Sequence, residues 1–167
     1  MIFTPSAGPL GAHPAPYITK CVARVATLAV GDVVVTSFLH STPVLDPSLG
    51  YDPLYVFNCV APADGNLTNN NGYIGVVTDL NGTSGAAGSI VTVQFGGIVT
   101  AKVTPSTTLV PGTILTPSDA GATFVDGGGA TAATVGGAVL MQDTTGTSTI
   151  LARVFVPLQY WFRIATP

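Results

Sequence analysis

Charged side chains are scarce in this sequence, and glutamate is absent altogether. Aspartate, lysine and arginine together make up 8% of the 167 residues, whereas an ordinary soluble domain carries about 25%. A soluble monomer normally keeps a charged surface that holds it apart from its neighbours, and the cores of protein interfaces are depleted in charge. We therefore expect that other subunits cover much of this surface.

Clustered positive charge and long apolar runs are missing as well. The five Lys and Arg residues are scattered along the chain, and the net charge is −3. Nucleic-acid binding needs grouped basic side chains that displace counterions, so we expect no nucleic-acid partner. No run approaches the roughly 18 apolar residues of a membrane helix, and the aromatic residues lack the girdle spacing of a transmembrane barrel. The sequence therefore predicts no membrane partner.

Recognisable catalytic and metal-binding motifs are absent too. His13 lies in a proline-rich stretch, and His40 ends an apolar run in a chain without a Gly-x-Ser-x-Gly nucleophile motif. Asp46 and Asp52 flank a Pro/Gly loop, where aspartate makes turn hydrogen bonds far more often than it performs catalysis. Residues 64–66, followed by Asn69–Asn71, offer oxygen ligands but only one charge, too few for a calcium loop. We expect a protein that is not an enzyme, with no catalytic residue, no metal site and no cofactor.

The chain is rich in short runs of β-branched residues that Gly, Pro, Asn and Asp interrupt, which is typical of strands and turns. Asn71-Gly72 and Asn81-Gly82 are strong tight-turn signals, and no segment shows a convincing 3.6-residue apolar period. The sequence predicts an all-β fold with a compact, barrel-like or sandwich-like body, in which Cys21 and Cys59 are buried apolar residues. The expected strands are Ile18–Thr27, Asp32–Leu39, Leu54–Val60, Gly72–Asp79, Ser89–Val103, Thr113–Thr116, Thr123–Val125, Gly137–Gln142, Ser148–Val156 and Leu158–Ile164.

An extended, Pro-rich arm, residues 1–16, precedes this body, residues 17–167. It contains four prolines and no periodic pattern, and proline fixes φ and removes a hydrogen-bond donor. One interpretation is a disordered terminus. The other is an arm that lies along a partner, because a purely solvated tail would not need apolar anchors. The candidate contacts in this region are Phe3, Pro5, Pro9, Leu10 and Tyr17.

The two halves of the body resemble each other. Residues 23–32 and 101–113 each contain a strand pattern followed by Leu-x-x-Gly, with three residues inserted in the second copy. Gly31 and Gly112 would then hold equivalent positions before a strand, where a Cβ would hinder a sharp turn. Chance similarity between Val-, Thr- and Gly-rich segments is the alternative. We infer two related β units, which span about residues 17–96 and 97–167.

The second of these units carries a family resemblance. Its motifs are Gly97–Val103 (GIVTAKV), Leu109–Leu115 (LVPGTIL), Val135–Val139 (VGGAV) and Ser148–Val154 (STILARV). This pattern resembles the small head-decoration, or capsid cement, proteins of tailed bacteriophages, and it covers about residues 89–156.

The resemblance implies a β-barrel-like unit that sits at symmetry axes of the capsid lattice, commonly as a trimer, and clamps neighbouring coat subunits. The expected partners are the major capsid protein and further copies of this chain. The expected location is the outer surface of the virion capsid, after synthesis in the host cytoplasm. The extra upstream unit, the arm and the aromatic C-terminus depart from the family pattern, so they leave the oligomeric state and the docking site open.

The C-terminal segment is the other candidate contact. In an extended conformation its residues alternate between two faces, one of which carries the only tryptophan beside an arginine. One interpretation of this segment is a closing strand with one buried face. The other is an interface, because tryptophan, tyrosine and arginine are enriched among interface hot spots, so Tyr160, Trp161 and Arg163 are candidate assembly contacts. The alternative function is a receptor- or carbohydrate-binding module of a tail fibre or another virion appendage, with Tyr51, Tyr55 or Trp161 as stacking platforms.

Overall fold

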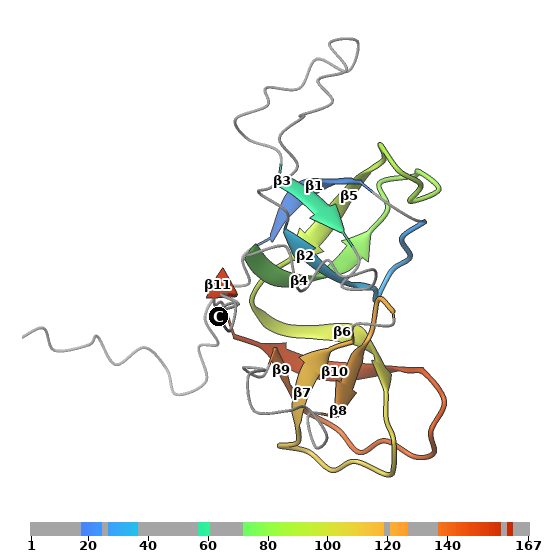
Figure 1. The fold of residues 1–167 in the computed structure, drawn as a ribbon, viewed down its shortest axis with the longest axis vertical. Helices are drawn as coiled ribbons and strands as arrows, with labels where there is room; N and C mark the ends of the chain where they lie inside the picture. The colour runs from blue at the N-terminus through green and yellow to red at the C-terminus, as the bar shows by residue number, and fades with distance from the viewer. Residues whose placement is uncertain are drawn as a thin grey trace, which may run out of the picture.

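The computed structural model describes residues 18–24, 27–36, 57–60, 72–118, 121–126, 137–157 and 160–161. These residues form an all-β fold, as the sequence predicts (Figure 1). The predicted arm, residues 1–16, lies outside the described residues, and so do residues 41–53 and 62–71. The strands are β1 (Ile18–Ala23), β2 (Val33–Thr36), β3 (Phe57–Val60), β4 (Gly72–Asp79), β5 (Ile90–Gln94), β6 (Gly97–Thr104), β7 (Ile114–Pro117), β8 (Phe124–Asp126), β9 (Ala138–Leu140), β10 (Ile150–Val156) and β11 (Tyr160–Trp161).

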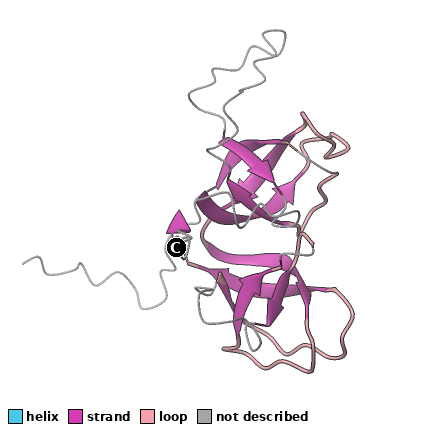
Figure 2. Ribbon diagram, viewed as in Figure 1, coloured by secondary structure: helices cyan, strands magenta, loops and turns pink. Residues whose placement is uncertain are grey.

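Two sets of five strands each close on themselves. In the first unit, β1–β5, the neighbours run β1-β3-β2-β4-β5, and β5 pairs with β1 again. In the second unit, β6–β10, the closed barrel runs β6-β8-β7-β9-β10, and β10 pairs with β6. Figure 2 shows the two sets as separate groups of strands stacked on each other. Closure leaves neither unit with an open sheet edge between its own strands.

The two units have the same topology. Each strand of the first unit corresponds to the strand five places later, and the neighbour order is then identical. The strand directions agree as well: β1–β3 and β6–β8 are parallel, and the other four pairings in each unit are antiparallel. Two halves with one topology are what a duplicated unit would produce. The duplication itself stays a prediction.

Gly31 and Gly112 occupy equivalent positions, each two residues before β2 or β7. Their φ angles are +88° and +91°, a left-handed conformation that glycine adopts without the steric cost of a Cβ. The Gly31 N–H donates to the carbonyl of Val77 at 2.8 Å, and the Gly112 N–H donates to that of Leu140 at 2.8 Å. The Leu-x-x-Gly motif therefore marks the same turn in both units.

The sequence match finds the corresponding strands but misses their register. Ala23 pairs with Cys59 and Val103 pairs with Phe124 at the same step of the parallel ladders, so Ala23 corresponds to Val103 and not to Ala101. Four residues then separate Ala23 from Leu28, and five separate Val103 from Leu109. The second unit carries one inserted residue here, where the sequence match required three.

The predicted single strand Ser89–Val103 is wrong. The structure divides it into β5 and β6, with a break at Phe95 and Gly96. Gly97 has a φ of +82°, and the Gln94 amide donates to the carbonyls of Gly96 and Ile98 at 2.8 and 3.0 Å. A continuous β-branched pattern does not reveal this change of direction, which joins the two units.

Each unit has its own interior, and one apolar cluster joins the two. Cys21, Val34 and Val93 are among the buried residues inside the first unit. Val33 and Val76 point outward from that unit, yet both are fully buried, because they belong to the apolar cluster that fills the second unit. Figure 1 shows β4 of the first unit above β6 of the second. The two units are therefore held together by a shared core.

Candidate functional site

Titratable groups do not gather into a reaction centre in the described part of the chain. No group of three or more His, Cys, Asp or Glu side chains there could hold a metal ion. Nor is any helix in that part long and apolar enough to cross a membrane. The residues weighed from the sequence for catalysis or cation binding, His13, His40, Asp46, Asp52 and 64–66, lie outside the described residues.

Cys21 and Cys59 are the described side chains whose thiols could in principle act as a nucleophile or as metal ligands. Both thiols are free and fully buried, on the adjacent parallel strands β1 and β3. A side-chain hydrogen bond with Cys59, together with burial, raises the pKa of the Cys21 thiol far above its usual range. A thiol that stays protonated is a poor nucleophile and a poor metal ligand. The pair therefore acts as core packing, as the sequence predicts.

Polar side chains at one end of the second unit satisfy one another. The Ser106 backbone N–H and hydroxyl both donate to the Asp126 carboxylate. Nearby, the Thr104 hydroxyl lies 3.2 Å from the Thr123 hydroxyl and 2.7 Å from the Thr149 hydroxyl. These contacts tie β6 and β8 to the loop before β10. Their donors and acceptors serve the ends of the strands, which is a structural role.

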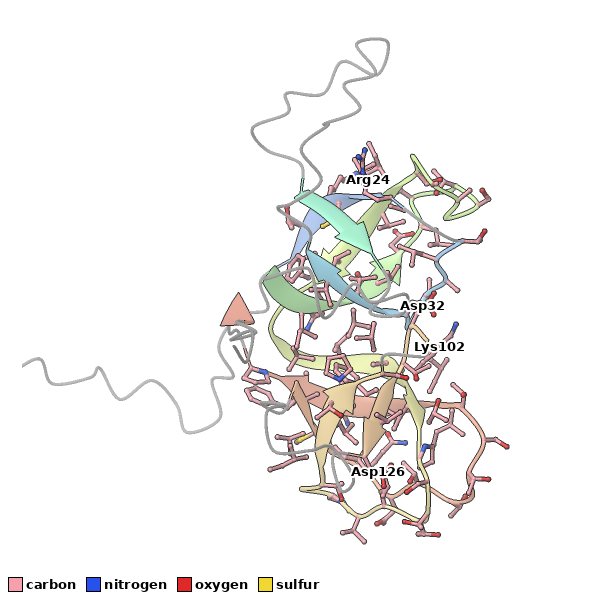
Figure 3. All side chains as sticks on the ribbon, viewed as in Figure 1. Arg24, Asp32, Lys102 and Asp126 are labelled. Carbon is pink, nitrogen blue, oxygen red and sulfur yellow. The ribbon has the colours of Figure 1, made fainter. Side chains whose placement is uncertain are left out.

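An ion pair between Lys102 and Asp32 crosses between the two units. Lys102 on β6 places its Nζ 2.6 Å from Oδ1 of Asp32, whose side chain is 6% exposed. The other carboxylate oxygen accepts the Ala29 N–H at 2.7 Å. The Lys102 backbone N–H also donates to the carbonyl of Gly31 at 2.7 Å. Figure 3 shows Asp32 and Lys102 side by side where the units meet. This arrangement fixes the units relative to each other.

Most of the predicted contact residues cannot be placed. Phe3, Pro5, Pro9, Leu10 and Tyr17 of the arm region, and Arg163, lie outside the described residues. Tyr160 and Trp161 form β11, which pairs with Tyr73 and Gly72 of β4. The backbone after the second unit therefore returns to the first unit. The predicted strand Leu158–Ile164 is confirmed only at these two residues.

The sequence did not show which apolar side chains of the strands and turns would be exposed on the surface. Among the described residues, six large hydrophobic side chains are between 45% and 60% exposed. The hydrophobic alternation of a strand shows which residues share a face, but it does not show which face the second unit covers. The six are Ile18, Val30, Val110, Ile114, Met141 and Leu151.

Comparisons with known proteins name no family for this chain. No protein-family model matches it, and no curated protein matches it either.

Proposed function

We propose that this protein is a structural capsid decoration protein, which binds and stabilises the assembled head shell of a tailed bacteriophage. Its partners are the major capsid protein and further copies of itself. It performs no reaction and needs no cofactor. The protein acts by burying apolar surface across several subunits, so that binding to the assembled shell stabilises that shell by mass action.

One observation supports this proposal most: a rigid β body that leaves apolar side chains on its surface. The two closed units share a buried core, so the body docks without first ordering itself, and preorganisation of this kind favours affinity. Ile114, Val110 and Leu151 remain more than half exposed in a chain whose charged fraction is only 8%. Buried interface cores have this composition.

The resemblance of the second unit to phage decoration proteins supports the specific assignment. Parts of the segments that carry it lie in β6, β7, β9 and β10 of the closed barrel. A five-stranded barrel agrees with the compact β-barrel-like unit that the resemblance implies.

The test is a shell-binding measurement. Purified protein is added to phage heads that lack it, and occupancy is measured by electron microscopy and by sedimentation with the heads. We expect saturable binding to assembled heads and none to free coat subunits, together with greater resistance of the occupied heads to heat. Binding to cells or glycans by the isolated protein, without binding to heads, would overturn the proposal in favour of a receptor-binding module.

The arm provides a second test. A chain lacking residues 1–16 should keep the melting temperature of the full chain within the small change typical of surface residues. It should also occupy fewer sites on the heads. Equal occupancy would show that the arm makes no contact, and loss of folding would show that the boundary of the body is wrong.

A further inference from the structure

The second unit carries an apolar row across four neighbouring strands. Ile114 pairs with Val139, Val139 pairs with Phe155, and Phe155 pairs with Ile98. Directly paired residues project from the same face of a sheet, and the alternating burial of β6 and β10 places this face on the outside of the barrel. Ile114 is 60% exposed, and the other three side chains are partly exposed. We call these four residues the second row.

The first unit has the same row at the equivalent positions. Val33 pairs with Val76, Val76 pairs with Gln94, and Gln94 pairs with Ile18. Val33 and Val76 are 0% exposed and Gln94 is 7% exposed. Only Ile18, at the end of the row, is half exposed. We call these residues the first row.

The second unit covers the first row. Val33 and Val76 belong to the apolar cluster of that unit, and the Val33 N–H donates to the carbonyl of Ala122 in the second unit at 2.9 Å. Gln94 turns its amide toward Gly96 and Ile98, where the second unit begins. Within one chain, therefore, this row is the place where another β unit of the same fold docks.

The second row is the more apolar of the two, although it is the exposed one. Where the first row has Gln94, the second has Phe155, and Ile114 replaces Val33. Solvent exposure alone would favour polar residues at these positions. The first unit of the same chain leaves Ile114 open, because the shared core and the Asp32–Lys102 pair already fix where that unit sits.

We propose that the second row is the surface through which a second copy of this chain docks. This inference deepens the self-association in the proposed function by naming its surface. The equivalent row shows that a unit of this fold covers such a surface, so a further copy extends an interface that the molecule already forms. Arg153 and Thr100, which pair with each other on the next exposed row, border it, as polar residues border the apolar core of an interface.

The test compares Ile114→Asp with Val30→Asp in the full chain. Both residues are at least half exposed, and Val30 lies in a turn of the first unit and is not a member of the row. Sedimentation velocity over a range of concentrations gives the mass and the dissociation constant of each protein. We expect wild type and Val30→Asp to form the same discrete oligomer. Ile114→Asp should dissociate into monomers, or weaken association by about tenfold or more, because it buries an unpaired charge.

Folding is checked by circular dichroism and by the melting temperature extrapolated to low concentration. If Ile114→Asp were misfolded, Ile114→Ser and Phe155→Ser would replace it. A wild-type protein that stays monomeric at high concentration would overturn the inference, and so would an oligomer that every row variant leaves intact. These failures are distinct from failure of the proposed function, because head binding is measured separately and a monomer can still occupy the heads.

Discussion

The two units share one topology but place large and small core side chains at different positions. Cys59 in β3 and Phe124 in β8 hold the same register position, and both are fully buried. At the ends of β5 and β10 the order of sizes is reversed, with Phe95 directly after β5 and Val156 at the equivalent point in β10. Among the side chains that the structure describes, each unit therefore buries one phenylalanine in its interior, Phe95 in the first and Phe124 in the second, at positions that do not correspond. Close packing conserves the total volume more strictly than the residue at each site.

A second difference between the two cores is Gly75 in the first unit, where the second unit has Ala138. A Cβ on Gly75 would lie 2.5 Å from Val93 Cγ1 and 2.8 Å from the Phe95 ring, which is closer than real contacts allow, so the first unit needs glycine there. The equivalent residue in the second unit is Ala138, which pairs with Leu115 as Gly75 pairs with Val34. In the second unit the smaller Val156 takes the position of Phe95, so one of the two side chains that would hinder a Cβ in the first unit is smaller there.

The largest expected change in stability comes from replacing Phe124 and Cys59, which hold equivalent positions but differ in size, with alanine. Phe124→Ala should lower the free energy of unfolding by about 3–5 kcal/mol, because it removes a buried ring and leaves a cavity. Cys59→Ala, at the equivalent position, should lower it by only about 1–2 kcal/mol. Urea unfolding of both variants measures the difference. Equal losses would contradict the idea that the two cores carry their volume at different sites.

A smaller effect distinguishes the two turn glycines. Gly31→Ala and Gly112→Ala both force a Cβ into the left-handed region, which costs about 1–2 kcal/mol. At Gly31 the new Cβ also meets Leu151 Cδ2 at 2.6 Å, whereas nothing lies within 4 Å at Gly112. Gly31→Ala should therefore destabilise the protein more in urea unfolding.

The matched control for that pair is Leu151→Ala. Combined with Gly31→Ala it should remove the excess loss, since the far end of the Leu151 side chain is the atom in the way. The same second change added to Gly112→Ala should give simple additivity. An identical loss for the two single glycine variants would show that the clash relaxes without cost.

Breaking the ion pair between the units should lower stability by a similar or smaller amount. Lys102→Met should lower the free energy of unfolding by about 1–2 kcal/mol, because the buried Asp32 carboxylate loses its ion pair and keeps the hydrogen bond from the Ala29 N–H. Lys102 is 32% exposed, so water screens part of the effect. Asp32→Asn combined with Lys102→Met should recover stability relative to Lys102→Met alone. A double variant less stable than the single one would show that the amide is worse placed than the lone carboxylate.

Much of the fold was predictable from the sequence, for reasons visible in particular residues. Gly72–Asp79 is predicted to the residue, because its β-branched run ends just before Asn81-Gly82. The positive φ values of these two residues and the hydrogen bond from the Thr83 N–H to the Leu80 carbonyl form the predicted tight turn. The Leu-x-x-Gly turns are also located correctly, because glycine readily adopts the positive φ that these turns require. The break at Phe95 is missed, because the residues on both sides of it remain β-branched.

The second row could not be predicted from periodicity. Its four residues lie on strands far apart in the sequence, and only the barrel register brings Ile114, Val139 and Phe155 together. Whether an outward valine such as Val33 is covered depends on how the two units pack. That packing is a tertiary property, which strand patterns do not encode.

The smallest predicted effect concerns pH, and it belongs to the first unit alone. The hydrogen bond with Cys59 and burial raise the pKa of Cys21 in the folded protein, whereas the unfolded thiol titrates near its usual value of about 8.5. A raised pKa in the folded state gives stability that is complete below the unfolded pKa and is lost as the pH rises above it. Between pH 7 and pH 9 the loss should be about 1 kcal/mol or less. The equivalent position in the second unit is Ala101, which has no proton to lose.

Urea unfolding at the two pH values tests this, with wild type compared against Cys21→Ala so that other titrating groups cancel. The variant should be less sensitive to pH, although its stability at pH 7 also changes because a buried sulfur is removed. A thiol reagent provides the independent readout, since a buried, protonated Cys21 should react at the rate of unfolding and not at the rate of a free thiolate. Rapid labelling of the folded protein at pH 7, or an unchanged pH dependence in Cys21→Ala, would show that the thiol is accessible and that its proton contributes nothing to the stability of the first unit.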